Sequence, residues 1–467
     1  MKLDDALLER WQSIVARKGD APAIFNTRAE VSRTFRQIDE RACDFERKID
    51  NFKAGSVIAV QIGNHEDWPS ILIACLRRGV LVLPLEQSIG DQQRDAALKI
   101  CNASGVVAAA VTGDRDLEIL PMRTSAATTH WAENPPSLLK LTSGTTAAPR
   151  AIRFRSQQLL ADCDQICDTM GISDVDLNFG VIPVSHSYGF SNLLTPMIAR
   201  GVAMVLSQDR TPRAVLDDIA KTNATVFPGM PVFYQAFCEM ENAPPLANLR
   251  LCISAGAPLP IATAKKFREK FGLPIHSFYG ASECGGICYD REVTNDLEGF
   301  VGAPMKDVDL EMVEPSAEAS QIRVRSPAIG DGYFPEPDEG KLGDGSFVPD
   351  DLLTRHGSGF KIVGRISDVI NVAGRKVNPA EIEEQLLRFP GVRQAVAFGR
   401  PAGAGLRNEE VAACVVVDVD LRENDILEFC RKVLSAWQAP KRIFIVDSIP
   451  TNERGKINRR ELAKRFR

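Results

Sequence analysis

The sequence predicts an α/β fold: a large N-terminal domain of helix-covered sheets with a β-rich subdomain, followed by a small α+β C-terminal domain. The chain has 467 residues, whereas single hydrophobic cores stop growing at about 250 to 300 residues. Strand-like and helical patterns alternate over the first part of the chain, which is typical of parallel sheets covered by helices. Residues 310–345 instead carry short alternating runs among Gly, Pro and Asp, which predicts the β-rich subdomain.

The first elements follow one another at short intervals. Apolar residues with helical spacing predict helices over residues 5–15, 34–49, 68–77 and 156–170. Short β-branched or apolar runs predict strands over residues 22–25, 56–62, 80–85 and 105–111. No internal repeat and no low-complexity segment interrupts this order.

The remaining elements are predicted in the same way. Strands are expected over residues 202–206 and 224–227 and from residue 251, and a helix over residues 261–271. Asn378-Pro379 followed by acidic residues predicts the start of a helix. Beyond it, strands are expected over residues 392–398, 411–417 and 442–446, and a helix over residues 424–436.

The composition excludes several classes of protein. Hydrophobic residues make up 44% and charged residues 25% of the chain, as in ordinary globular proteins. The net charge of -5 argues against a nucleic-acid or anionic-membrane partner. No run approaches the roughly 18 apolar residues of a membrane span, and the acidic first residues lack a signal-peptide core.

The cysteines indicate a reducing compartment. All eleven are scattered without a Cys-x-x-Cys pair, so we expect a cytoplasmic protein. Cys163 and Cys167, like Cys284 and Cys288, are four residues apart but have no second pair of metal ligands nearby. We therefore expect small buried hydrophobic side chains here rather than zinc ligands.

A hydroxyl-rich loop at residues 142–150 is the strongest local motif. It lies between the apolar run 138–141 and the strand-like run 150–154, which predicts a loop joining two strands. Glycine allows close approach of a ligand, and successive N–H groups and hydroxyls bind oxyanions. A polar surface turn is the alternative for this cluster alone. The spacing is not that of a Walker loop.

A second motif joins an apolar run, residues 179–184, to a turn that contains His186. This order predicts a polar ring near the carboxyl end of a strand, where α/β folds bind ligands. A lone histidine can also be a satisfied structural residue.

Taken together, the motifs resemble the adenylate-forming superfamily of acyl-CoA synthetases, aryl-CoA ligases, luciferases and peptide-synthetase adenylation domains. The loop is similar to the family pattern Thr-Ser-Gly-Thr-Thr-Gly-x-Pro-Lys-Gly, with Ala147, Arg150 and Ala151 as replacements. Residues 277–283 resemble Tyr-Gly-x-Thr-Glu, and residues 449–459 resemble Leu-Pro-x-Thr-x-x-Gly-Lys-x-x-Arg. The motifs span residues 34–459, nearly the whole chain.

The resemblance implies an ATP site with Mg²⁺. Asp351 would hold the ribose hydroxyls, although Pro349 and Asp350 replace the family's Thr-Gly before it. Glu283 would be the metal carboxylate, because Mg²⁺ typically takes one or two carboxylates and shares the substrate's phosphates. The implied ATP-binding residues are Thr142, Ser143, Gly144, Thr145, Thr146, Arg150, Gly256, Ala257, Pro258, Phe278, Tyr279, Gly280, Ser282, Asp351 and Arg365.

The resemblance also implies an acyl pocket. Peptide-synthetase adenylation domains carry an aspartate beside the position of His186, and none occurs between Pro183 and Asn192. Gly285 and Gly286 are expected to leave the pocket wall open. The implied lining is His186, Ser187, Tyr188, Gly229, Gly285, Gly286 and Ile287.

The implied domain boundary separates residues 1–365, with the carboxylate and ATP sites, from a mobile domain at residues 366–467. By resemblance, Ser367 is the hinge and Gly374 lines the coenzyme A tunnel. The catalytic residues would be Lys456, Glu283, His186 and Arg365. We expect Arg459, Arg460, Lys464, Arg465 and Arg467 to form a solvated face.

The implied reaction is activation of a carboxylic acid by ATP through an acyl-adenylate, followed by transfer to the thiol of coenzyme A. Loading of a carrier-protein phosphopantetheine is the alternative, and a non-catalytic relative is a third. Retention of Glu283, Asp351, Arg365 and Lys456 argues against the third. The sequence does not name the acid.

Overall fold

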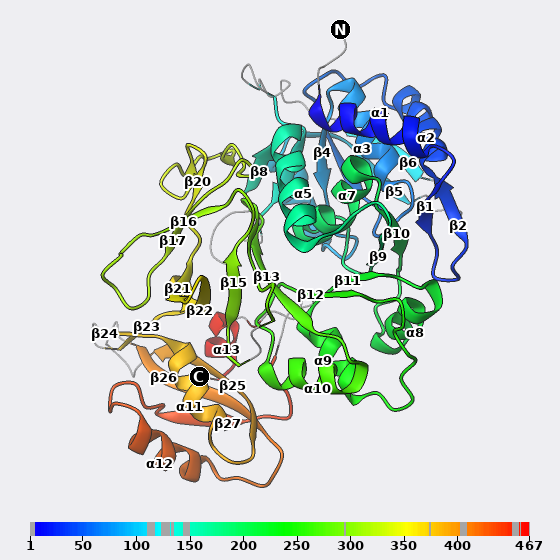
Figure 1. Cartoon of the computed structure of the whole chain (residues 1–467). Coiled ribbons are helices and arrows are strands. Elements are labelled where there is room, and N and C mark those ends of the chain that lie inside the picture. The colour runs from blue at the N-terminus through cyan, green and yellow to red at the C-terminus, as the bar shows by residue number, and fades with distance from the viewer. Residues whose placement is uncertain are drawn as a thin grey trace. The chain divides into compact units, whose positions relative to one another are not determined.

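The computed structural model (Figure 1) describes residues 5–109, 117–122, 131, 135–142, 150–293, 296–372, 375–401, 409–450, 457 and 459–466. The chain forms two compact units. The first consists of Met1–Glu311, Arg323–Pro349 and Gly357–Phe360, and the second of Met312–Ile322, Asp350–His356 and Lys361–Arg467. Which residues move as a C-terminal domain stays a prediction.

One sheet of the first unit contains the strands on both sides of the hydroxyl-rich loop. Its order is β18-β8-β7-β4-β3-β5-β6. The central strands are parallel, whereas β6, β8 and β18 run antiparallel to their neighbours. The strands are β3 (Val57–Gln61), β4 (Leu81–Pro84), β5 (Ala103–Ala109), β6 (Leu117–Pro121), β7 (Leu138–Leu141), β8 (Ala151–Phe154) and β18 (Tyr333–Phe334).

A second sheet of this unit places the strands in the order β2-β1-β10-β9-β11-β12-β13-β14-β15. Its strands are parallel from β1 to β13, and β2, β14 and β15 are antiparallel additions. They are β1 (Pro22–Phe25), β2 (Val31–Thr34), β9 (Leu177–Gly180), β10 (Ala203–Leu206), β11 (Val226–Gly229), β12 (Leu251–Ser254), β13 (Ile275–Ala281), β14 (Gly285–Tyr289) and β15 (Phe300–Pro304).

The register of this sheet corrects one expectation. The strand expected over residues 224–227 instead covers Val226–Gly229, so Pro228 and Gly229 belong to β11. Gly229 pairs with Ser254, and Ser254 pairs with Ser277, so the three strands continue side by side. The turn begins only at Met230, the N-cap of the next helix.

The first two helices begin at side-chain caps. Asp5 accepts hydrogen bonds from the backbone N–H groups of Leu7 and Leu8, both at 3.0 Å, and Thr34 forms a capping box with Gln37. The helices of this unit include α1 (Ala6–Lys18), α2 (Phe35–Lys48), α3 (Trp68–Arg78), α4 (Asp91–Ile100), α5 (Ser156–Met170), α7 (Thr195–Arg200), α8 (Pro212–Thr222), α9 (Pro231–Glu239) and α10 (Ile261–Phe271). None of the described helices is long and apolar enough to span a bilayer.

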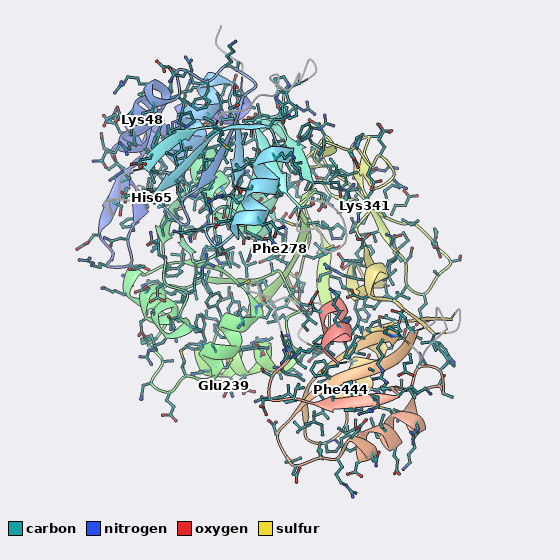
Figure 2. All side chains as sticks on the ribbon, turned by 180° about the vertical axis from the view of Figure 1, so that it is seen from behind. Lys48, His65, Glu239, Phe278, Lys341 and Phe444 are labelled. Carbon is teal, nitrogen blue, oxygen red and sulfur yellow. The ribbon has the colours of Figure 1, made fainter. Side chains whose placement is uncertain are left out.

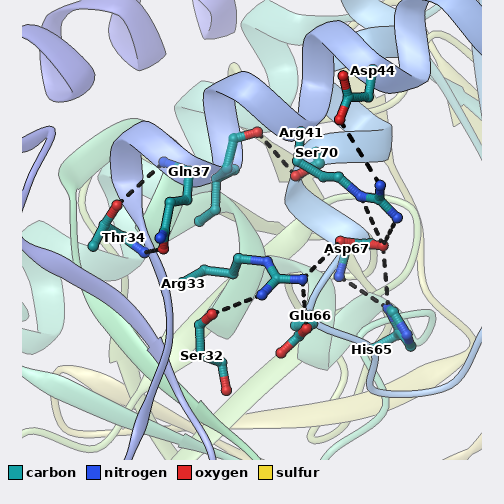
Figure 3. A network of polar contacts seen from close by, with 11 residues as sticks. Ser32, Arg33, Thr34, Gln37, Arg41, Asp44, His65, Glu66, Asp67 and Ser70 are labelled. Atoms are coloured by element: carbon teal, nitrogen blue, oxygen red, sulfur yellow. Dashed lines mark hydrogen bonds and ion pairs between the residues drawn. The ribbon is translucent and has the colours of Figure 1, made fainter. Parts of the chain in front are cut away.

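A buried polar joint ties α2 to the segment that precedes α3 (Figure 3). The Asp67 side chain is 2% exposed, and its Oδ2 accepts a hydrogen bond from Nη2 of Arg41 at 3.1 Å. Arg33 Nη2 lies 2.7 Å from Glu66 Oε1, and Ser70 Oγ donates to the Ile38 carbonyl at 3.0 Å. Removing one partner of a buried ion pair leaves the other charge buried and unpaired, which is unfavourable. These contacts therefore hold the two helices in place.

The β-rich region predicted for residues 310–345 is confirmed. It contains β16 (Asp309–Met312), β17 (Ile322–Arg325), β19 (Leu342–Gly343) and β20 (Ser346–Phe347). Strands β17, β20 and β19 form antiparallel pairs.

The second unit is built on the sheet β25-β26-β27. One apolar cluster packs Ile382, Leu386 and Ile426 against this sheet, and another packs Leu462 against Phe398. The elements are β21 (Asp351–His356), β22 (Gly359–Arg365, shared with the first unit), β23 (Ile370–Val372), β24 (Arg375–Val377), α11 (Pro379–Leu387), β25 (Val392–Pro401), β26 (Glu409–Val417), α12 (Glu423–Val433), β27 (Arg442–Ile445) and α13 (Arg459–Arg465).

Arg459 corrects a second expectation, because it is not part of a solvated face. Its Nη1 lies 2.5 Å from Asp368, its Nη2 lies 2.8 Å from Glu383, and its Nε donates to the Ala397 carbonyl at 3.0 Å. Only 21% of the Arg459 side chain is exposed. Arg459 therefore anchors α13, whereas Lys464, at 65% exposure, is solvated as predicted.

Candidate functional site

Strands flank the hydroxyl-rich loop on both sides, as predicted, and they pair antiparallel. Leu141 on β7 pairs with Ala151 on β8. The backbone N–H and the hydroxyl of Thr142 both donate to the Arg150 carbonyl, at 2.8 and 3.1 Å. Ser143, Gly144, Thr145 and Thr146 lie outside the described residues.

The side chains of Arg150, Tyr333 and Glu283 lie in a row. The Arg150 guanidinium carbon lies 4.1 Å from the centre of the Tyr333 ring, and the Tyr333 hydroxyl donates to Glu283 Oε1 at 3.0 Å. Burial, reinforced by the neighbouring Glu283 charge, raises the pKa of the Tyr333 hydroxyl well above its usual value, so it remains a donor. Tyr333 was not predicted from the sequence, because only the pairing of β18 with β8 brings it here.

The loop after β13 places two predicted site residues side by side. Ser187 Oγ donates to Ser282 Oγ at 3.0 Å. Ser187 was assigned to the acid and Ser282 to ATP, so the two proposed subsites meet at this hydrogen bond. On β13 itself, Phe278 and Tyr279 are buried, at 8% and 7% exposure. Figure 2 labels Phe278 among the side chains of the chain.

Gly280 is required by the return of the chain after this loop. A Cβ atom at Gly280 would lie 2.6 Å from the Gly285 carbonyl oxygen. The close approach keeps Ser282 and Glu283 in a tight turn between β13 and β14.

His186 begins a short helix, α6 (Ser187–Gly189), that runs into a π-helical turn at Phe190–Leu194. The Tyr188 N–H donates to His186 Nδ1 at 3.2 Å, so in this arrangement His186 carries its proton on Nε2. A Cβ at Gly189 would lie 2.1 Å from the Pro183 carbonyl, which requires glycine there. The preceding strand, β9, ends at Gly180, earlier than predicted. The π-helical turn agrees with a functional role for this segment, because such turns are frequent at functional sites.

Tyr188 closes the space between this turn and the second sheet. Its hydroxyl donates to the carbonyls of Gly229 and Ile253, at 3.3 and 3.4 Å, and its ring lies 5.8 Å from that of Phe278. Burial raises the pKa of the Tyr188 hydroxyl well above its usual value. Both strands that accept these bonds end at the same edge of the sheet.

Small residues follow β12, as predicted. Gly256 has a φ of +84°, and Gly256, Ala257 and Pro258 are exposed at the carboxyl end of the strand. Their exposure leaves backbone available for a flat ring.

The expectation of an open wall at Gly285 and Gly286 is wrong. A Cβ at Gly285 would lie 2.0 Å from Asp162 Oδ1, and one at Gly286 would lie 2.6 Å from Met305 Sδ. Ile287 is completely buried. The two glycines are therefore needed for close packing, and Asp162, which no sequence motif selects, fills the space beside Gly285.

The second unit brings two predicted residues together. Asp351, at the start of β21, is 7% exposed, and Arg365 Nε donates to its Oδ1 at 2.6 Å. Ser367 lies in a 3₁₀ turn, Ile366–Asp368. Gly374 and Lys456 lie outside the described residues.

A match to known protein families covers most of the chain. Residues 11–334 match the AMP-binding enzyme family, and residues 381–456 match the AMP-binding enzyme C-terminal domain. The chain belongs to the AMP-binding enzyme family. The predicted superfamily and α/β fold class are thereby confirmed.

Similar proteins indicate the kind of reaction that this AMP-binding enzyme catalyses. It is 28% identical over 443 residues to a feruloyl-CoA synthase from Amycolatopsis sp, a match that covers 89% of each chain. It is 24% identical over 530 residues to a long-chain-fatty-acid–CoA ligase from Escherichia coli, covering 98% of this chain and 94% of that one. These relatives support the predicted AMP-forming ligation of an acid to coenzyme A and do not support a carrier-protein partner.

This AMP-binding enzyme has the same fold as a protein of known structure. ATP-bound MatB from Rhodopseudomonas palustris superposes with a TM-score of 0.85 at 21% identity, over 98% of each chain.

Proposed function

We propose that this AMP-binding enzyme activates a fatty or aromatic acid with ATP and transfers the acyl group to the thiol of coenzyme A. The observation that carries the proposal is the hydrogen bond between Ser187 and Ser282, which joins the turn assigned to the acid with the motif assigned to the phosphates. A carboxylate bound at this turn has its reacting oxygen next to the α-phosphate.

The reaction proceeds in two displacements. A carboxylate oxygen of the acid attacks the α-phosphorus of ATP, and pyrophosphate leaves. The thiol sulfur of coenzyme A then attacks the acyl carbon, loses its proton, and AMP leaves. Catalysis of the first displacement is mainly positioning and electrostatic stabilisation by groups held in place before reaction.

Glu283 fits the role of a Mg²⁺ ligand. It is a single carboxylate on the tight turn after β13, and Tyr333 holds its Oε1 by a hydrogen bond. Bound Mg²⁺ would neutralise charge on the phosphates. Tyr333 orients the carboxylate, and Arg150 beside it contributes positive charge at the stem of the loop.

The nucleoside is assigned to the residues that the family motifs match. Asp351, oriented by Arg365, accepts from the ribose hydroxyls, and the exposed backbone at Gly256 and Ala257 contacts adenine. Lys456 stabilises the first transition state. Rotation at Ser367 then replaces Lys456 by the coenzyme A tunnel at Gly374. The free cysteines agree with the proposed cytoplasmic location.

The acid carries no α-amino group. No aspartate occurs between Pro183 and Asn192 to bind an ammonium, so we expect amino acids to be poor substrates. Tyr188, assigned to the acyl pocket, offers an aromatic ring there instead, and this ring packs against Phe278.

The proposal is tested by pyrophosphate release from the full chain with ATP, Mg²⁺ and a panel of fatty, aromatic and amino acids. We expect release with acids that lack an amino group, and formation of acyl-CoA and AMP when coenzyme A is added. Exchange of pyrophosphate with a proteinogenic amino acid alone would contradict the proposal.

A further inference from the structure

We infer that Asp162 closes the inner end of the acyl site, so that this enzyme uses short or single-ring acids rather than long-chain fatty acids. The inference rests on the proposed function and narrows its substrate class. Asp162 is the specificity-determining residue because its carboxylate occupies the volume that would otherwise receive an acyl tail.

The Asp162 carboxylate lies directly beside Gly285. A Cβ atom added to Gly285 would lie 2.0 Å from its Oδ1 and 2.7 Å from its Oδ2. The family resemblance assigns Gly285 and Gly286 to the wall of the acyl site. The space that these glycines leave is therefore filled by a charged side chain from α5.

Two hydrogen bonds hold the Asp162 carboxylate in place. Its Oδ1 accepts from the Gly286 N–H at 3.0 Å, and its Oδ2 accepts from Ser191 Oγ at 2.5 Å. Asp162 is 4% exposed. Moving it to admit a substrate would break two hydrogen bonds to a buried charge, which are among the stronger ones in proteins.

The buried Lys140 offsets the negative charge of Asp162. Lys140 on β7 is 5% exposed, and its ammonium lies 4.7 and 5.3 Å from the ring centres of Phe154 and Phe190. Burial lowers the pKa of Lys140, whereas the negative charge of Asp162 opposes this shift. The two charges support one another, so the carboxylate is stable where a hydrocarbon tail would be expected.

Two further glycines of the predicted acyl site are also closely packed in the described part of the chain. A Cβ at Gly286 would lie 2.6 Å from Met305 Sδ and 3.1 Å from Phe278, and one at Gly229 would lie 2.7 Å from Phe227. Tyr188 is held by two carbonyl groups. Each of these contacts is between protein groups that are already packed.

A closed inner end limits the binding that an acid gains from each added methylene. A roomy apolar site gains about fourfold in binding for each further methylene that it buries. In this site the gain should stop at a short chain, because the next methylenes meet a carboxylate.

The experiment measures kcat/KM by pyrophosphate release, with straight-chain acids from acetate to hexadecanoate and with benzoate. We expect the best of acetate, butanoate, hexanoate and benzoate to exceed hexadecanoate by on the order of tenfold or more. A rise that continues to dodecanoate or hexadecanoate would overturn the inference while leaving the proposed function intact. Failure of every acid would overturn both.

Variants assign the effect to Asp162. Asp162→Asn keeps the volume, its amide oxygen can still accept from the Gly286 N–H, and its amide nitrogen can donate to Ser191 Oγ in place of the bond that the carboxylate accepted, so the chain-length limit should persist. The double variant Lys140→Met with Asp162→Ala removes both charges together and opens space, so the optimum should move to longer acids. Asp164→Asn, on the same helix but paired with Arg200 in a half-buried ion pair, is the matched control and should keep the wild-type profile.

A second route keeps the test decisive if the double variant does not fold. Met305→Ala, on the same wall, should admit one or two further methylenes without touching a buried charge. A wild-type chain-length profile in the folded double variant would overturn the inference; if that variant does not fold, a wild-type profile in Met305→Ala would overturn it, because opening this wall would then not lengthen the acid.

Discussion

Replacement of Asn64 by alanine should destabilise the first unit and loosen the acid-site turn. Asn64 follows β3 and is 7% exposed. Its Nδ2 donates to the carbonyls of Gly180, Ile182 and Ser207, at 3.2, 3.3 and 3.1 Å, and its Oδ1 accepts from the Val184 N–H at 2.9 Å. One side chain thus ties the segment after β3 to the ends of β9 and β10.

The magnitude follows from the groups left unpaired. An unsatisfied buried backbone group costs about 1 to 3 kcal/mol. Gly180 keeps a second partner, the Ser207 N–H at 3.0 Å, so its carbonyl is not orphaned. The Val184 N–H and the other two carbonyls lose their partner in Asn64, and we expect Asn64→Ala to lower the free energy of unfolding by about 2 to 5 kcal/mol.

The assay is urea unfolding followed by tryptophan fluorescence, which reports mainly on the first unit because Trp11, Trp68 and Trp131 lie there. The control is Asn248→Ala, an exposed side chain with a single bond to Asn223 at 2.7 Å, which should stay within about 0.5 kcal/mol of wild type. Because Val184 leads directly to His186, KM for the acid should also rise in Asn64→Ala. A variant as stable as the control would refute this reasoning.

Three further predictions address the metal, the moving domain and pH. Glu283→Gln should raise the Mg²⁺ concentration for half-maximal adenylation by on the order of tenfold while leaving the fold intact; an unchanged Mg²⁺ dependence would remove Glu283 from the metal site. Lys456→Ala should slow adenylation by on the order of 10²-fold but spare thioester formation from supplied acyl-adenylate, and Ser367→Pro should show the reverse pattern because proline fixes φ; equal slowing of both halves in Lys456→Ala would refute domain alternation. Burial lowers the pKa of His276 from 6.5, so the unfolded chain binds its proton more readily and stability should fall as the pH drops below that value; His276→Gln should flatten this dependence, and an unaltered slope would show that other groups cause it.

Much of the fold could be predicted because local sequence and final structure agree. The predicted bounds of α5 and α10 equal the observed ones, since apolar periodicity is closed at Gly171 and Gly272 by a left-handed residue. The strand pair around the hydroxyl-rich loop followed from two apolar runs. The pairing of Asp351 with Arg365 joins two residues that family motifs had selected separately.

The features that were missed or mistaken depend on contacts between distant segments. Gly229 belongs to a strand because β12 continues beside it, which turn propensity does not reveal. Tyr333 reaches Glu283 from 50 residues away in the chain. The space at Gly285 is filled by Asp162, 124 residues before its partner Gly286, so no local pattern could show that the wall is closed.

The most direct test of the central claim is a single incubation of the purified chain with ATP, Mg²⁺, coenzyme A and benzoate or hexanoate, with the products identified by mass spectrometry. We expect equal amounts of AMP, pyrophosphate and acyl-CoA, and an acyl-adenylate that accumulates when coenzyme A is omitted. Release of ADP and phosphate, or acyl-CoA formed without AMP, would contradict the account.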